Sequence, residues 1–270
     1  MTAKNNDRNI SGLRLYGHYV SLHLRSVMQY KASFWMTVAG QFLATFNMFL
    51  SVYFLFDRFS SVEGFTYQEV LLCFSLMLTE YSLGECIARG FDSFDSMVRQ
   101  GEFDRVLTRP RSDILQVLGS KIELTRVGRL LQAGVMFVYG VTRSGVTWNA
   151  WRVITVLLML LGGTALFCGI FLLFASICFY TLEGLEFMNI LTDGAREYGK
   201  YPVSIYGRRM MQFCTFVIPY ALVQYYPLLV LLGRTDRNWY GLLPLGGLLF
   251  LLPCGMMWKL GVRHYQSAGS

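Results

Sequence analysis

Two acidic and two basic residues stand well inside segments that are largely apolar. Glu80 and Glu85 interrupt the segment 67–89, and Arg126 and Arg129 interrupt the segment 113–141. A charged group inside a membrane-spanning helix costs about 3 kcal/mol or more, so it usually pairs with an opposite charge or faces a water-filled pathway. Ion pairing and transport are therefore the two kinds of chemistry that these four residues could serve.

The depth of each residue in a membrane predicts how the four would pair. If the second and third helices are adjacent and antiparallel, a rise of about 1.5 Å per residue places Glu85 level with Arg126, and Glu80 level with Arg129. We therefore expect the ion pairs Glu85–Arg126 and Glu80–Arg129. Two roles stay open: the pairs only hold two helices together, or Glu80 also lines a route and attracts a cationic substrate.

The segments around these residues have the length and composition of membrane-spanning helices. Of 270 residues, 54% are hydrophobic and 15% are charged, whereas soluble domains are about 25% charged. The stretches 34–56, 153–180 and 210–232 contain no Asp, Glu, Lys or Arg, and a bilayer core about 30 Å thick needs about 20 apolar residues of helix. The sequence predicts a single-domain, all-α, polytopic membrane protein over 1–270. Its six transmembrane helices are expected at about 34–56, 67–89, 113–141, 153–180, 210–232 and 240–260.

The residues before the first span predict a helix that lies on the membrane surface. Basic and polar side chains recur every three or four positions from Arg14 to Gln29, and apolar side chains from Leu13 to Val27 recur on the other side. Such an amphipathic pattern suits the headgroup layer, although a soluble surface helix can share it. We expect residues 1–32 to form a cytoplasmic tail and an interfacial helix.

Two of the predicted spans are irregular. The uncharged part of the third, 130–141, is too short to cross a bilayer alone, so this span must include the charged turns before it. The fifth contains Pro219 and Pro227, and proline kinks or locally unwinds a helix. We therefore expect the fifth span to be bent.

The distribution of lysine and arginine predicts the orientation. Of the 24 such residues, 19 fall in the N-terminus, the segment 90–112, the start of the third helix, the connection 181–209 and the tail, and five fall in the remaining loops. Cytoplasmic segments of membrane proteins carry an excess of basic residues. Both termini and both long connections are therefore predicted to face the cytoplasm of a cell-membrane protein. This bias also explains the net charge of +7 without nucleic-acid binding.

Signatures of an enzyme or a cofactor site are absent from the sequence. It has no P-loop and no His-Glu-x-x-His zinc motif, and no nucleophile-elbow motif. The six cysteines lie in apolar segments without zinc-ligand spacing. We expect no catalytic residue, no metal ligand and no cofactor held by this chain. The energy for any transport must then come from a partner or from an ion gradient.

A polar segment between the second and third spans, 92–112, is suited to docking a soluble partner. A short helix that enters a cleft on another protein needs an apolar plug, and charges around it that fix its register. The expected plug is Phe103 with Val98 and Leu107. The charges expected around it are Glu102, Asp104 and Arg105. A merely solvated loop is the alternative.

This segment resembles a stretch of the type-2 ATP-binding-cassette (ABC-2) permeases. Gln100-Gly-Glu-Phe-Asp-Arg-Val-Leu-Thr-Arg-Pro110 is similar to their Gly-Glu-Phe/Leu-Asp-x-x-Leu-x-Lys/Arg-Pro stretch. Tyr201-Pro-Val-Ser-Ile-Tyr206 is similar to their Tyr-Pro-x-x-Ile-Tyr element, and Phe216-Val-Ile-Pro219 and Tyr226-Pro227 follow in the same order. The acidic pair Glu80 and Glu85 lies outside the resemblance.

The resemblance implies a six-span permease subunit that forms a pathway with a second ABC-2-type permease, either a copy of this chain or a related one. It also implies a separate ABC ATPase that binds ATP and Mg²⁺ itself and docks on a cytoplasmic coupling helix. The residues that the resemblance assigns to ATPase coupling are Gln100, Gly101, Glu102, Phe103, Asp104, Arg105, Leu107, Arg109 and Pro110. Those assigned to a helix kink and the pathway are Tyr201, Pro202, Tyr206, Pro219 and Pro227.

We therefore interpret the sequence as the permease subunit of an ATP-driven exporter in the lipid bilayer. Small amphipathic or cationic compounds, antibiotics and lipids all fit as cargo. A gradient-driven secondary transporter is the alternative; it predicts inverted repeats, and the sequence shows no repeat. A membrane-embedded enzyme would need a cluster of catalytic side chains that the sequence lacks.

Overall fold

The computed structural model describes residues 12–59, 61–181, 194 and 197–266, and these residues are helical apart from turns, loops and one isolated bridge, Val62–Phe65. The long helices are α1 (Gly12–Gln29), α2 (Lys31–Arg58), α3 (Tyr67–Asp92), α7 (Val127–Arg143), α8 (Ala150–Ile177) and α13 (Leu245–His264). The short ones are α4 (Phe94–Arg99), α5 (Glu102–Leu107), α6 (Asp113–Ser120), α10 (Arg208–Phe216), α11 (Tyr220–Val223) and α12 (Tyr225–Leu231). Three 3-10 turns complete the fold: η2 (Leu124–Arg126), η3 (Val203–Tyr206) and η4 (Asn238–Leu242).

Among the described residues, four helical segments are long and apolar enough to cross a membrane: α2, Tyr67–Arg99, α8 and α13. A fifth is present if α10 and the helices after it count as one span, because the two parts meet at 85°. The all-α, multi-pass fold is thus confirmed. The predicted number of six spans is not, since two of the predicted spans are interrupted.

The third predicted span, 113–141, is divided into two helices. α6 ends at Ser120, the chain is extended at Lys121, and α7 begins only at Val127 and has 17 residues. The reason lies in how α6 packs: a Cβ at Gly90 would lie 1.9 Å from the Val117 carbonyl oxygen. α6 therefore rests backbone to backbone on the end of α3 and belongs to the polar end of the molecule.

The fifth predicted span is bent at its prolines. Pro219 lies between α10 and α11, and Gln224 separates α11 from α12. Pro227 falls in the first turn of α12, where its missing N–H removes no helical hydrogen bond. The bend therefore falls where the sequence places Pro219, and Pro227 is accommodated just beyond the second break.

Glycines allow the central helices α3, α8 and α13 to pack closely. A Cβ at Gly84 of α3 would lie 2.7 Å from the Phe167 Cβ of α8, and a Cβ at Gly247 of α13 would lie 2.1 Å from the Gly162 carbonyl oxygen of α8. Small residues let helices approach one another in membranes, where dispersion contacts stabilise the pair. α3 and α8 form the core, with 78% and 61% of their apolar windows buried, whereas α2 and α13 lie at the edge, with 17% and 22%.

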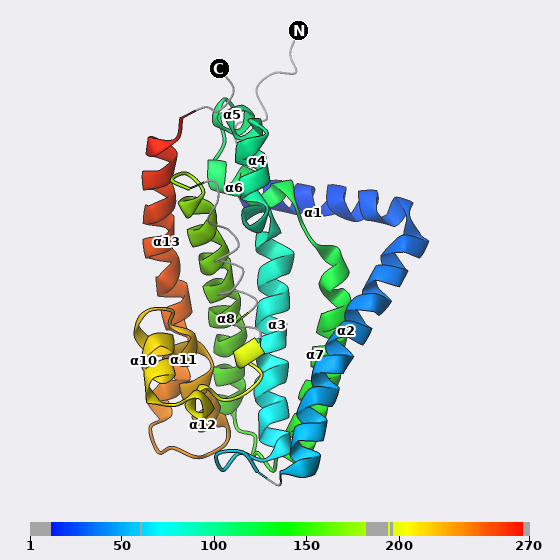
Figure 1. Cartoon of the computed structure of the whole chain (residues 1–270), viewed down its shortest axis with the longest axis vertical. Helices are drawn as coiled ribbons and strands as arrows, with labels where there is room; N and C mark the ends of the chain where they lie inside the picture. The colour runs from blue at the N-terminus through cyan, green and yellow to red at the C-terminus, as the bar shows by residue number, and fades with distance from the viewer. Residues whose placement is uncertain (1–11, 60, 182–193, 195–196, 267–270) are drawn as a thin grey trace.

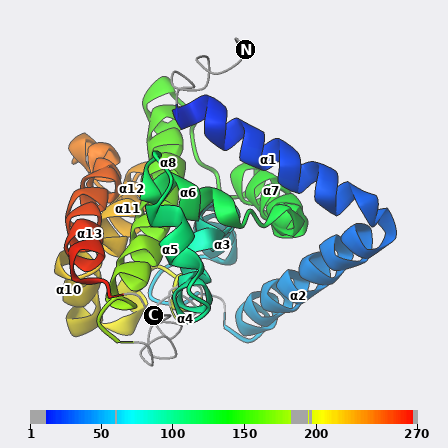
Figure 2. The same ribbon diagram turned by 90° about the horizontal axis from the view of Figure 1, so that it is seen from above.

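Helix α1 lies across the end of the bundle that also carries α4, α5 and α6 (Figures 1 and 2). Non-helical dihedral angles at Tyr30 separate it from α2. Gly119 of α6 makes room for Tyr19, since a Cβ there would lie 2.4 Å from the tyrosine ring. The Tyr16 hydroxyl donates to the Ile87 carbonyl at 3.4 Å. α1 thus packs against α3 and α6, and its position in the headgroup layer stays a prediction; residues 1–11 of the expected tail lie outside the described part.

Candidate coupling segment and intramembrane charge cluster

The predicted coupling stretch folds into two short helices, α4 and α5, at one end of the bundle (Figure 1). Gly101 joins them with a φ of 70°, a left-handed conformation that glycine adopts without steric cost. Arg109 and Pro110 follow α5 and precede α6. Gln100, Gly101, Arg109 and Pro110 therefore shape the turns on either side of α5.

Phe103 is fully buried within its own chain, which corrects the prediction of an apolar plug for a partner. Four aromatic rings surround it at centroid distances of 5.0 to 6.1 Å. They belong to Phe94, Phe179, Trp258 and Tyr265. Val98 is also buried, with 4% exposed. The sequence could not show this, because the rings come from distant parts of the chain.

Two hydrogen bonds add to this aromatic cluster. The Tyr265 hydroxyl donates to Asp104 Oδ1 at 3.0 Å, and the Trp258 Nε1–H donates to Asp113 Oδ2 at 2.8 Å. Burial raises the pKa of the Tyr265 phenol, and its hydrogen bond to Asp104 raises that pKa further, so the phenol stays a donor. Asp104, predicted to fix the register of a partner, thus binds α5 to the end of α13.

The outer face of the segment remains open to solvent. Leu107 is 43% exposed. The exposed polar and proline residues around it are Gln100, Glu102, Arg105, Arg109 and Pro110. Of the three residues predicted to form the apolar plug, Leu107 is thus the one that remains exposed, in a segment that also exposes charged side chains.

The charge cluster inside the bundle centres on Glu85. Its carboxylate is 3.1 Å from Arg126 Nη2 and 2.5 Å from Arg129 Nη1, and Arg129 Nε donates to the Gln41 side chain of α2 at 2.7 Å. The expected Glu85–Arg126 pair is therefore present. One carboxylate ties α3 to η2 and α7, and through Gln41 to α2.

The expected Glu80–Arg129 pair is not formed. Glu80 is fully buried, and neither of its carboxylate oxygens has a hydrogen-bond partner among the described residues. A Cβ at Gly163 would lie 2.2 Å from the Glu80 carboxyl group, so Glu80 faces α8 while Glu85 faces α7. The depth argument failed because residues five apart on a helix point in different directions, and because α7 starts after a break.

The sequence predicted that the connection 181–209 lies at the coupling end. Its described final part, residues 197–209, lies elsewhere in the bundle. The Gln224 amide donates both to the Gly199 carbonyl and to the carbonyl of Cys73, in the first half of α3. Figure 1 shows α10, α11 and α12 around the lower part of the bundle, opposite α4 and α5. Lys200, and Arg208 and Arg209 at the start of α10, therefore leave the basic end. The excess of Lys and Arg at the coupling end over the opposite end is therefore smaller than predicted, but the coupling end still carries more of them.

The Tyr-Pro element packs beside the bend. Pro202 is buried and precedes η3, and Tyr206 is exposed. Tyr201 is partly buried against the core. The Tyr198 ring contacts the rings of Tyr206 and Tyr220, at 6.4 and 6.2 Å. The element thus braces the start of α10 against α11.

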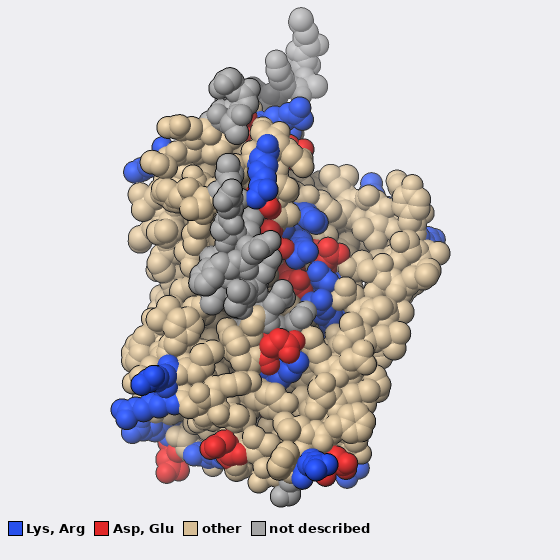
Figure 3. Space-filling model, viewed as in Figure 1, with Lys and Arg blue, Asp and Glu red and all other residues tan. Residues whose placement is uncertain are grey.

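Charged side chains gather at the two ends of the molecule and in a central strip of the face shown in Figure 3. Broad areas on either side of the strip carry no charge, as a surface in contact with lipid requires. Within the described ranges, no three His, Cys, Asp or Glu residues come close enough to hold a metal ion.

Sequence reasoning missed two groups of residues in these clusters and the bundle. Gln41 and Gln132 are polar residues within apolar helices. A polar residue in such a helix is itself a signal of a buried contact or a site, and the sequence analysis did not use it. The aromatic partners of Phe103 carried no local signal, because Trp258 and Tyr265 lie at the far end of the chain.

Comparison with known proteins agrees with this architecture. A family model described as "ABC-2 family transporter protein" matches residues 42–269, which is most of the chain. The chain belongs to the ABC-2 transporter family. It is therefore a multi-pass membrane protein of the permease type, the part of such transporters that lacks the ATPase. No curated protein and no solved structure matches this ABC-2 chain.

Proposed function

We propose that this ABC-2 protein is the permease subunit of an exporter, driven by a separate ABC ATPase that docks on α4 and α5 from the cytoplasm. The observation that carries the proposal is how α5 is anchored. Phe103 and Asp104 fix its start within the chain, whereas Leu107, one turn further along, and the charged side chains of Glu102 and Arg105 are exposed.

A coupling element must bind its partner, and it must transmit the partner's movement to the membrane helices without deforming. Phe103 packs against Trp258 of α13 and against Phe179, which follows α8. A Cβ at Gly261 would lie 2.3 Å from the Phe179 ring, so α13 approaches that ring closely. A displacement of α5 would thus reach two long helices directly. The ATP and Mg²⁺ belong to the ATPase, and a second ABC-2-type permease would complete the pathway.

The excess of lysine and arginine at the end with α1, α4 and α5 supports the cytoplasmic placement of that end. The start of α1 and the end of α13 also lie there in Figure 1. The alternative, a gradient-driven transporter, would need no docking surface. Its hallmark would be a midplane ionisable group open to water, whereas Glu80 is enclosed between α3 and α8.

Co-purification tests the proposal. The tagged permease is expressed with candidate ABC ATPases from its own genome, and the ATPase recovered per permease is measured. We expect Leu107→Ala combined with Glu102→Ala to lower recovery at least tenfold without changing permease yield. Arg237→Ala, an exposed change at the opposite end, is the matched control. If the double variant recovers as much ATPase as the control, α5 is not the docking element.

A further inference from the structure

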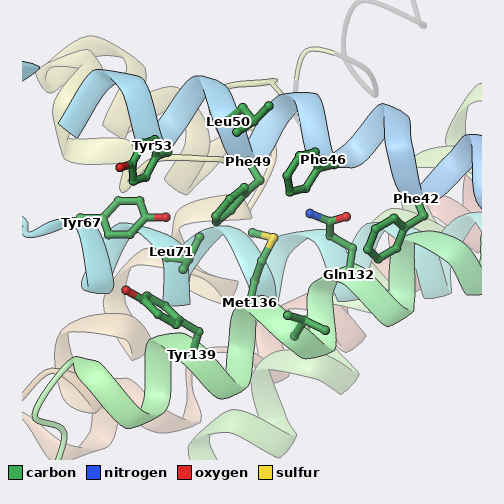
Figure 4. A pocket seen from close by; sticks show the side chains of 11 residues that line it. Phe42, Phe46, Phe49, Leu50, Tyr53, Tyr67, Leu71, Gln132, Met136 and Tyr139 are labelled. Atoms are coloured by element: carbon green, nitrogen blue, oxygen red, sulfur yellow. The ribbon is translucent and has the colours of Figure 1, made fainter. Parts of the chain in front are cut away.

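A groove of about 380 Å³ lies between α2, α3 and α7. Its lining is mostly aromatic, and Figure 4 shows these rings with Leu71 and Met136 between them. Along α2 it extends from Phe42 to Tyr53, about 16 Å of helix, roughly half of a bilayer core about 30 Å thick. Its size and lining are typical of small-molecule sites, which hold about 300–1,000 Å³ and carry few polar groups.

One buried polar atom of the groove, the Gln132 Oε1, has no hydrogen-bond partner among the described residues. Gln132 of α7 is 4% exposed, and its Oε1 accepts no hydrogen bond from any described residue. Figure 4 shows its amide directed into the groove beside Phe42 and Phe46. No water is available in the bilayer core to satisfy such a group, and a buried amide without a partner is costly. The position therefore calls for a hydrogen-bond donor on whatever fills the groove.

The chemistry of the groove limits the class of molecule that can bind in it. No charged side chain among the described residues lines it. The cationic Arg129 lies three residues before Gln132 on α7 and is bound to Gln41 and Glu85. A cationic ligand in the groove would lie close to that guanidinium group, and no carboxylate would be there to pair with the ligand. A phospholipid acyl chain would fill the apolar part but would leave Gln132 unsatisfied. An uncharged hydroxyl on an apolar body satisfies both requirements.

The groove also faces the lipid. Leu43 of α2 and Val135 and Val138 of α7 are each more than 60% exposed on neighbouring surfaces, where a membrane would supply the contacts. A molecule dissolved in one leaflet could reach the groove without passing through water.

We propose that this groove binds an uncharged, membrane-dissolved amphiphile with one hydroxyl donor, which Gln132 accepts, and that this molecule is cargo on its way from the bilayer. The role as cargo rests on the proposed transport function, whereas the binding does not.

Photolabelling tests the binding. The permease alone is placed in phosphatidylcholine nanodiscs with an aliphatic diazirine probe that carries a terminal hydroxyl, or with its methyl ether, which has no donor. Labelled peptides are quantified by mass spectrometry. We expect the hydroxyl probe to label 42–53 and 132–139 about tenfold more than the ether, since losing one hydrogen bond to a buried group changes affinity by about that factor. Excess dodecanol should compete, and dodecane should not.

The variant Gln132→Met keeps the length of the side chain and should lower labelling by the hydroxyl probe to the level of the ether. Val138→Met, on the exposed side of the same helix, should leave labelling unchanged. The thermal midpoints of both variants show whether they fold. Equal labelling by the two probes, or labelling spread evenly over α2, α7 and α13, would overturn the proposal. Because no ATPase is present, this outcome is independent of the docking experiment on α5.

Discussion

Tyr265 donates a hydrogen bond to Asp104 at 3.0 Å, although 161 residues separate them. This contact joins the end of α13 to the middle of α5. Phe103 lies next to Asp104 and is 5.1 Å from the Tyr265 ring, centroid to centroid. The coupling segment is therefore held from the far end of the chain as well as by α3, from which it emerges.

Phe103→Ala should lower the free energy of unfolding by about 3–5 kcal/mol, because it empties a fully buried aromatic position. Leu107→Ala, four residues away and exposed, should change it by less than about 0.5 kcal/mol. Denaturant titrations in mixed micelles measure both values. Equal effects would mean that Phe103 is not the internal anchor of α5.

Tyr265→Phe should cost about 1 kcal/mol, since it removes one hydrogen bond and keeps the ring. The raised pKa of Tyr265 keeps the phenol protonated, so this contribution is fully present below about pH 10 and is lost as pH rises through the raised pKa. The difference between the variant and the parent should therefore be constant from about pH 6 to 9. Thermal midpoints of both proteins across that pH range measure the difference. A difference that varied with pH would contradict the prediction.

Glu85→Gln should destabilise the protein by about 3–5 kcal/mol, because it leaves Arg126 and Arg129 without their shared carboxylate. Glu80→Gln should have a smaller effect, of about 1 kcal/mol or less, since it removes no ion pair among the described residues. The same titrations compare the two. In a transport assay, Glu80→Gln should leave the choice between cationic and neutral cargo unchanged; altered selectivity would place Glu80 on the route.

Gly247→Ala should weaken the contact between α8 and α13 by about 1–3 kcal/mol, since its Cβ would lie 2.1 Å from the Gly162 carbonyl oxygen. Gly255→Ala in the same helix is the control, because nothing lies within 4 Å of its Cβ. Melting of each variant in nanodiscs gives the comparison. If Gly255→Ala lowered the stability as much as Gly247→Ala, the loss would come from alanine anywhere in α13 and not from the close contact with α8.

Single cysteines in a cysteine-free background should report the orientation. Ser96→Cys in α4 should react with a membrane-impermeant maleimide only after the cells are opened, and Thr235→Cys should react in intact cells. Ser96 lies in α4 and Thr235 lies in the loop after α12, at the opposite end of the bundle. Labelling of Ser96→Cys in intact cells would reverse the proposed topology.

The sequence by itself determined the environment and the general architecture of this protein. Uncharged stretches long enough to cross a bilayer required helices, because lipid offers no partner for an open backbone, and Pro219 marked the bend in the fifth of them. The motif from Gln100 to Pro110 indicated the family that the whole-chain comparison confirmed. All of these signals are local in the chain, so they could be read without the fold.

Only the tertiary structure decided which side chain meets which. It buried Phe103 within rings that come from the end of the chain, turned Glu80 towards α8, and gave Glu85 both arginines. Burial and pairing depend on the rotation of each helix about its axis and on breaks such as the one at Lys121. Residue spacing alone does not fix these, because contacts between distant helices set them.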